Sequence, residues 1–171
     1  MKIVLKYIIV LSFIINYSCT NFSASKHLSI TIDAVIGKTD SINVYYSKNK
    51  SITFNDKQSF WVKVSGSKKN QKIKILFPDS LQPLQIRLDF GRNVAQPPIV
   101  INKIEFSYQK KCFSLKGKEI FYILRVDDSN STLDPLNGSI NRKKSNQING
   151  PSLYPAGDKL YNKLTELYSK N

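Results

Sequence analysis

The chain has 171 residues, 26 Lys and Arg against 12 Asp and Glu, a formal net charge of +14, two Cys and one His. This length suits one domain, and a hydrophobic share of 41% is enough to build a core, so wholesale disorder is excluded. Two Cys and one His also exclude a disulfide-rich scaffold and metal sites built from several Cys or His ligands.

The positive charge comes almost entirely from lysine, because only four of the 26 cationic residues are Arg. Nucleic-acid readers depend on Arg for bidentate base and phosphate contacts, and no helix-turn-helix, finger or aromatic RNA-reading motif occurs. We therefore expect no nucleic-acid partner. A Lys-rich surface suits an anionic membrane or polysaccharide, and lysines that are simply solvated on strand faces are the plain alternative.

Residues 1–25 have the features of an export signal. Lys2 and Lys6 precede the apolar run 7–15, which is too short to span a bilayer but suits a signal peptide. The run leads to Cys19, and a lone Cys at this position resembles a bacterial lipoprotein box, in which the thiol receives a diacylglycerol. We expect an exported, membrane-anchored lipoprotein at the bacterial cell envelope, lipidated at Cys19. The alternatives are cleavage after Ser25, which gives a secreted soluble protein, and an uncleaved N-terminal anchor.

A lipidated Cys19 leaves Cys112 without a disulfide partner. Cys112 lies between strand-forming residues, so we expect a small buried hydrophobe rather than a reactive thiol. A catalytic thiol needs a nearby His, and His27 lies at the edge of the first expected strand, only eight residues after Cys19. We therefore predict no catalytic residue here.

Residues 26–126 form a series of short segments in which apolar and polar residues alternate with a period of two. Turn residues separate the segments, and no alternation of strands with helices supports a parallel sheet. The sequence therefore predicts a mainly β protein, an antiparallel β-sandwich of jelly-roll-like form with a short C-terminal α-helix. The expected strands cover 28–34, 42–46, 52–54, 60–64, 73–77, 84–90, 99–106, 112–115 and 120–126.

Residues 127–150 are polar and rich in turn formers, so a flexible loop is expected. Residues 151–171 are expected to contain a helix that starts near Asp158, with Leu160, Leu164 and Leu167 on one face. We expect this helix to dock on the sandwich or cover its edge; the alternative is a helix that lies on a membrane or a partner.

The segment 51–106 carries a more specific order of features. Phe60–Val64 and 71–78 are followed by Leu84-Gln-Ile-Arg-Leu-Asp-Phe-Gly91 and then by the apolar strand 99–106. This order resembles galactose-binding and other carbohydrate-binding β-sandwich modules of bacterial envelope and membrane glycosyltransferase proteins. The resemblance implies an envelope-associated sandwich, with Arg87 and Asp89 tying neighbouring strands together.

Ligand contact is expected at four residues. Trp61 is the only Trp, and alternation places it opposite Phe60 and Val62, where it could stack on a sugar with Tyr45 as a second platform. The alternative is that both faces of this strand are covered, one by the second sheet and one by the C-terminal helix. Arg87 and Asp89 complete the candidate set.

No cofactor and no metal are expected, because the strand-end carboxylates show no calcium-loop spacing. The sequence thus favours a non-catalytic binding or assembly role at the envelope, with a glycan or an envelope protein as partner. The second hypothesis is a carbohydrate-binding module that uses Trp61 and Tyr45, and the third is a small hydrolase.

Overall fold

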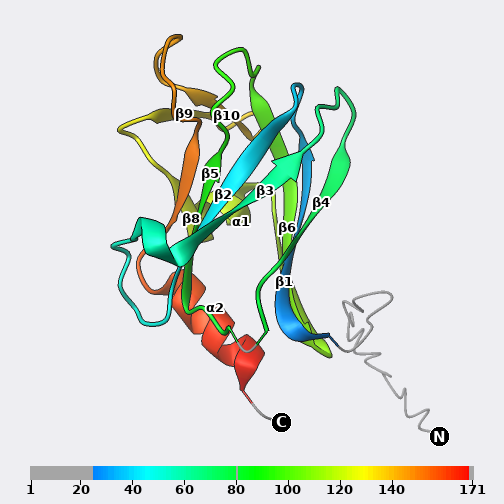
Figure 1. The fold of residues 1–171 in the computed structure, drawn as a ribbon, viewed down its shortest axis with the longest axis vertical. Helices are drawn as coiled ribbons and strands as arrows, with labels where there is room; N and C mark the ends of the chain where they lie inside the picture. Colours follow the sequence, from blue (N-terminus) through cyan, green and yellow to red (C-terminus); the bar gives the residue numbers. More distant parts are fainter. Residues whose placement is uncertain (1–24, 80, 170–171) are drawn as a thin grey trace, which may run out of the picture.

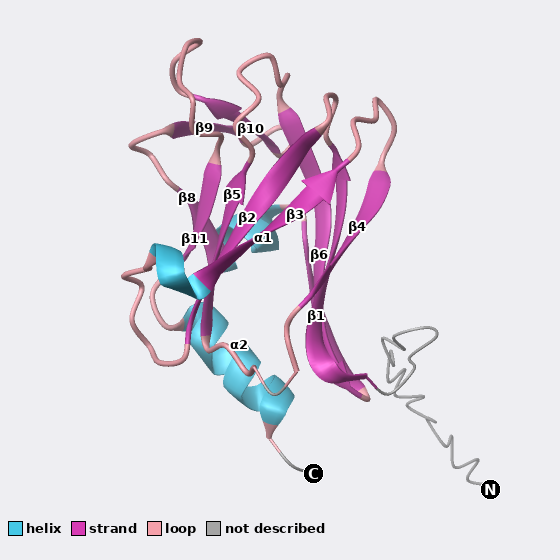
Figure 2. Cartoon of the chain, viewed as in Figure 1, coloured by secondary structure: helices cyan, strands magenta, loops and turns pink. Residues whose placement is uncertain are grey.

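The computed structural model describes residues 25–79 and 81–169, which form two antiparallel β-sheets packed face to face (Figure 1). This architecture confirms the predicted β-sandwich. Two short helices and a 3-10 turn complete it, and Figure 2 shows the longer helix at the end of the sandwich where β1 begins.

The two sheets differ in size. The first has the order β4-β1-β6-β10-β9, with β7 paired to β6 beside this path, and the second has the order β3-β2-β5-β11-β8. The strands of the first sheet are β1 (Ser25–Val35), β4 (Gln71–Leu76), β6 (Ile99–Gln109), β7 (Lys111–Lys116), β9 (Ser131–Asp134) and β10 (Ser139–Arg142). Those of the second are β2 (Asp40–Ser47), β3 (Ser59–Val64), β5 (Gln85–Phe90), β8 (Leu124–Val126) and β11 (Ser152–Pro155). The helical segments are η1 (Asp56–Gln58), α1 (Lys118–Ile123) and α2 (Lys159–Tyr168).

Alternation decides which side chains meet between the sheets. In β1, Ile30 and Ile32 are fully buried, and Ile86 and Leu88 are fully buried in β5. Each such side chain contributes about 1.5–3 kcal/mol when it leaves water. The opposite side chains of the same strands point away from the core, so the sheet register fixes which residues each outer face displays.

Residues 120–126 do not form the expected central strand. Helix α1 occupies the segment up to Ile123, and only Leu124–Val126 continues as β8, at the edge of the second sheet. A continuous apolar run does not distinguish a helix from a buried strand, and here Ile120 and Ile123, three residues apart, both face the core. The expected strand 52–54 is also absent, since these residues lead as irregular backbone into η1.

Residues 127–150, expected as a flexible loop, contain the strands β9 and β10. Ile140 of β10 pairs with Ile99 of β6 and is fully buried, which extends the first sheet by two strands. Similarly, the segment 151–171 holds β11 before its helix, and β11 lies between β5 and β8. These strands were missed because they are short and their outward residues are polar.

Helix α2 closes one end of the sandwich, in agreement with the expected docking. Its Leu160, Leu164 and Leu167 are buried, and the helix packs against β5, β6 and β7. Its last residue, Tyr168, donates a hydrogen bond from its hydroxyl to the Pro83 carbonyl at 3.0 Å. Among residues 25–79 and 81–169, no helix has the length and apolar character needed to cross a bilayer.

The carboxylate of Asp40 organises the loop that follows β5. It accepts hydrogen bonds from the backbone N–H groups of Arg92 and Asn93, at 2.9 and 3.1 Å. Gly91 has a φ of 76°, and a Cβ at this residue would overlap the Asp40 carboxylate. Only glycine therefore fits at the end of the Arg87–Gly91 motif.

Candidate functional site

The four side chains expected to contact a ligand lie on one surface, the outward side of the second sheet. Asn43 of β2 lies opposite Trp61 of β3 on one side and Asp89 of β5 on the other, while Tyr45 lies opposite Arg87. Residues two apart on a strand share a face, so Trp61, Tyr45, Arg87 and Asp89 all point outward. We call this surface, together with Tyr154, the outer-sheet face.

Arg87 is held in a fixed position at the centre of the outer-sheet face. Its Nε and Nη2 donate to the two carboxylate oxygens of Asp89 at 2.7 and 2.6 Å. The guanidinium carbon lies 4.7 Å from the centre of the Tyr45 ring and 4.3 Å from that of Tyr154. The cation is thus stacked between two rings while a bidentate ion pair fixes its plane.

Tyr45 is half-buried because its neighbours cover much of its ring. Its hydroxyl donates to Asp56 at 3.0 Å, and Phe54 makes edge contacts with both Tyr45 and Tyr154. The ring surface toward β5 is taken by Arg87. Tyr45 therefore presents its polar edge more than an open ring to solvent.

Trp61 is the open aromatic side chain of this surface. It is 46% exposed, and its only ring contact in the described part of the chain is with the guanidinium of Arg92, 5.0 Å from the ring centre. Helix α2 packs on β5, β6 and β7 and does not cover β3. A planar, partly apolar ligand can thus reach Trp61 from solvent.

The ionisation states of this cluster are set by burial and by the carboxylates. Burial raises the pKa of Tyr45, and its hydrogen bond to Asp56 adds to the effect. Burial also raises the pKa of Tyr154. Burial alone would lower the pKa of Arg87, but the hydrogen bond and charge of Asp89 raise it above its ordinary value. At neutral pH the face therefore displays a permanent cation between two neutral phenols.

Three members of the cluster were not foreseen from the sequence. Tyr154 comes from β11, Phe54 from the loop before η1, and Arg125 of β8 lies 5.3 Å over the Tyr154 ring. The alternation Leu153–Tyr154–Pro155 was a signal for an outward Tyr154, but no local pattern tells which strand becomes the neighbour of β5. Pairing across the sheet decides it.

The predicted lipidation site, Cys19, lies outside the described residues. Cys112 lies in β7 and is half-buried; it is disulfide-bonded rather than a free thiol, so the expectation that it lacks a bonding partner is wrong. His27, the expected strand-edge residue, contacts the Asp79 carboxylate through Nδ1 at 2.8 Å.

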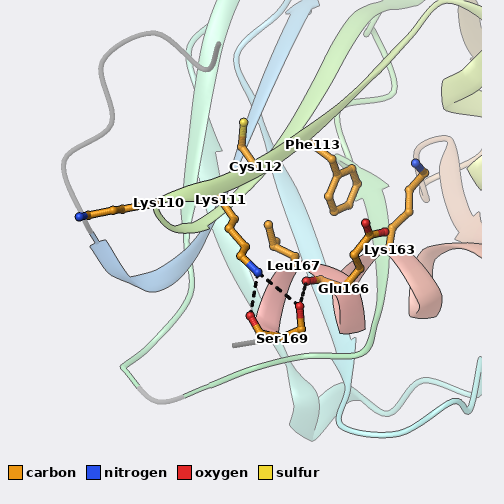
Figure 3. Close-up of a pocket in the computed structure, with 8 residues that line it drawn as sticks. All are labelled: Lys110, Lys111, Cys112, Phe113, Lys163, Glu166, Leu167 and Ser169. Carbon is orange, nitrogen blue, oxygen red and sulfur yellow. Dashed lines mark hydrogen bonds between the residues drawn. The ribbon is translucent and has the colours of Figure 1, made fainter. Parts of the chain in front are cut away.

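A groove of about 580 Å³ separates β7 from α2 (Figure 3). We call it the α2–β7 groove; Lys110, Lys111, Phe113, Lys163, Glu166 and Leu167 line it. Lys111 reaches across it and donates from Nζ to the carbonyl and hydroxyl oxygens of Ser169, at 2.8 and 3.3 Å. In Figure 3 the sulfur of Cys112 points away from Leu167 and Ser169.

A second, smaller hollow of about 350 Å³ lies beside the β9–β10 turn, where Leu136 is 96% exposed. Within residues 25–79 and 81–169, no group of three or more His, Cys, Asp or Glu side chains could hold a metal ion.

Comparison with known proteins adds no further assignment, because no protein-family model, curated protein or solved structure matches the chain. The resemblance to carbohydrate-binding sandwich modules therefore stays a prediction.

Proposed function

We propose that this protein is an exported protein of the cell envelope with a non-catalytic binding or assembly role, and that the outer-sheet face is its contact surface. The observation that carries the proposal is the exposed Trp61 beside a rigid Tyr45–Arg87–Tyr154 stack. Rigid aromatic and Arg side chains that need little ordering on contact are the residue types that dominate binding surfaces.

The engagement of the polar groups supports binding over catalysis. Both oxygens of Asp89 accept from Arg87, and the Tyr45 hydroxyl donates to Asp56. A general acid or base must be able to reach a substrate proton, and this carboxylate is committed to its own neighbour. The cluster suits recognition of a ligand by shape and charge.

A carbohydrate ligand is the second candidate, and the exposure of Trp61 favours it. An open indole can stack on the apolar face of a sugar ring. Asn43 and Asp89 lie in the same cross-strand row as Trp61, but Asn43 is buried and Asp89 is paired with Arg87, so Trp61 is the member of this row that a sugar could reach. In this reading Trp61 is the main platform, with Tyr45 contributing its hydroxyl edge.

The test compares Trp61→Ala with Tyr122→Ala in the processed chain. Tyr122 is a matched control because it is another exposed aromatic (62%) under a cation, Lys159, but lies on α1, away from the outer-sheet face. The readouts are a glycan array and crosslinking to envelope proteins. Glycan binding lost only in Trp61→Ala supports the carbohydrate module, and a protein crosslink lost only in that variant supports assembly. Binding that both variants retain unchanged excludes the outer-sheet face.

Attachment to the membrane is tested separately by the intact mass of the membrane-extracted protein. The lipoprotein-type signal predicts a diacylglyceryl group on Cys19, with residues 1–18 removed. The chain has only two cysteines, so a thioether at Cys19 and a disulfide between Cys19 and Cys112 exclude each other, and a count of free thiols before and after reduction distinguishes the two forms. A chain cleaved after Ser25, without lipid, contradicts the anchor and indicates a secreted protein.

A further inference from the structure

One corner of the outer-sheet face combines the open ring of Trp61 with two exposed cations, Lys63 and Arg92; we call these three residues the Trp61 corner. We propose that the Trp61 corner binds an acidic glycan, whose pyranose ring contacts the indole while the carboxylate on that sugar pairs with the two cations. The premise is the proposed role of the outer-sheet face as a contact surface, and what is added is the class of ligand that this face accepts.

The three side chains of the Trp61 corner come from two neighbouring parts of the second sheet. Trp61 and Lys63 are two residues apart on β3, so both point outward. Arg92 lies just after β5, and its guanidinium carbon is 5.0 Å from the centre of the indole ring. Asp40 fixes the backbone of this loop by accepting hydrogen bonds from the N–H groups of Arg92 and Asn93. The backbone of Arg92 is thus positioned, while its exposed side chain can turn toward a ligand.

Ion pairs do not neutralise the charge of the Trp61 corner. Among the salt bridges of residues 25–79 and 81–169, none includes Lys63 or Arg92. The carboxylates on the adjoining strands are engaged: Arg87 neutralises Asp89, and the two oxygens of Asp40 accept backbone N–H groups of the loop after β5. A carboxylate brought by a ligand therefore gains two cationic partners without breaking an ion pair of the protein.

The indole selects a ligand that has an apolar face as well as a charge. Trp61 is 46% exposed, and the C–H groups on one face of a pyranose can pack against an indole. In a sugar acid the carboxylate is attached at the edge of the same ring, so ring contact and charge contact are made together. The planar fork of a guanidinium matches a carboxylate, and an ammonium adds a second partner. A bare anion would leave the indole without a contact.

The number of open rings favours a sugar over a single-stranded nucleic acid. Proteins that bind single strands stack successive bases on several aromatic side chains along a basic groove. On the outer-sheet face, the rings of Tyr45 and Tyr154 both lie against Arg87. Trp61 is then the one open aromatic among the residues that define this face, which suits contact with one sugar ring.

The first experiment uses Trp61 fluorescence, because Trp61 is the single Trp of the chain and so reports contact at this corner alone. The processed chain is titrated with oligogalacturonate, and quenching of the fluorescence by acrylamide, a neutral quencher, is measured. Oligogalacturonate is expected to lower the quenching constant roughly twofold, because it covers one of the two ring faces. The methyl ester of the same oligomer keeps the ring and removes the charge. Each exposed ion pair is worth up to about fivefold in affinity, so the ester should bind roughly 5- to 25-fold more weakly.

The second experiment compares two double variants with the same loss of charge, Lys63→Gln with Arg92→Gln and Lys72→Gln with Lys74→Gln. Lys72 and Lys74 are matched controls, since they are exposed on β4, the edge strand of the first sheet, just as β3 is the edge strand of the second. Calorimetric titration measures the affinity of each variant for the acid and for the ester. The corner variant is expected to lose the preference for the acid, and the control variant is expected to keep it.

Three outcomes overturn the acidic glycan and leave the outer-sheet face as a contact surface. Equal affinity of the wild type for acid and ester indicates a neutral glycan. Protection of Trp61 by oligoglutamate in place of oligogalacturonate indicates an acidic protein partner. Protection by oligothymidylate in place of oligogalacturonate indicates a nucleic acid.

Two further outcomes remove the acidic glycan from this corner altogether. Equal losses of affinity in the corner and control variants show a general effect of the net charge of +14. Oligogalacturonate binding that leaves the quenching of Trp61 unchanged, and that Trp61→Ala retains, places the ligand elsewhere and contradicts the outer-sheet face as its site.

Discussion

Replacement of Arg87 by Lys should destabilise the fold although the charge is kept. The guanidinium makes two hydrogen bonds to Asp89 and lies against the rings of Tyr45 and Tyr154. An ammonium keeps at most one of the hydrogen bonds and loses the planar stacking. A hydrogen bond to a charged group contributes about 1.5–3 kcal/mol and each cation–π contact about 0.5–1 kcal/mol at exposed sites.

The Arg87 and Asp89 side chains are 21% and 19% exposed, so solvent screens part of this interaction. The expected net loss is about 2 kcal/mol, which corresponds to a fall in Tm of about 4–8 °C for a domain of this size. Urea unfolding followed by far-UV circular dichroism and by Trp61 fluorescence measures it. Arg125→Lys is the control. Arg125 is exposed and lies over the outer side of the same Tyr154 ring without a carboxylate partner in the described part of the chain, so this change should cost under about 0.5 kcal/mol. A loss in Arg87→Lys no larger than the control would refute the reasoning.

Three further outcomes follow from the packing. Burial raises the pKa of Tyr168 above 10.0, so above about pH 10 the folded chain keeps a proton that the unfolded chain releases. The free energy of unfolding of the wild type should therefore fall as the pH rises above about 10, and it should fall more steeply than that of Tyr168→Phe. Urea titrations across this pH range measure the difference. Gly91→Ala should lower the free energy of unfolding by about 2–3 kcal/mol, and Gly157→Ala by about 1 kcal/mol. Both glycines have a positive φ, but only Gly157 has open space where the new Cβ would lie. Thermal melts measure both losses. Leu164→Ala, which empties the contact of α2 with the sandwich, should cost about 2–5 kcal/mol in urea unfolding, while exposed Asn162→Ala stays within about 0.5 kcal/mol.

Period-two alternation was enough to predict the strands that carry most of the core. Each of β1, β2, β4 and β5 has apolar side chains on one face and polar ones on the other, so both their existence and their orientation could be read locally. The same alternation predicted the outward position of Trp61. Local patterns failed in two places. The apolar run that forms α1 and β8 is compatible with either a helix or a buried strand. The strands β9 and β10 are short and largely polar, so their alternation is weak.

Local sequence patterns predicted only some of the residues that form the outer-sheet face. Arg87 and Asp89 were expected to tie neighbouring strands together, whereas their side chains pair with each other along β5. The stacking of Arg87 on Tyr154 could not be predicted locally, because it requires β11 to lie beside β5, more than 60 positions earlier in the chain. The α2–β7 groove likewise depends on the docking of a helix against a hairpin distant in sequence.

The strand order also determines when the sandwich can assemble. β1 is central in the first sheet and pairs with β6, which follows it by more than 60 residues, while the second sheet needs β11 to join β5 to β8. Pairings between such distant segments form slowly, because a long loop must be ordered before any contact rewards it. The first sheet is complete only when β10 ends at Arg142, and the second only when β11 ends at Pro155, so each sheet needs most of the chain before its last strand can pair. Such late completion suits the export proposed for this protein, because a narrow translocation channel admits an unfolded chain.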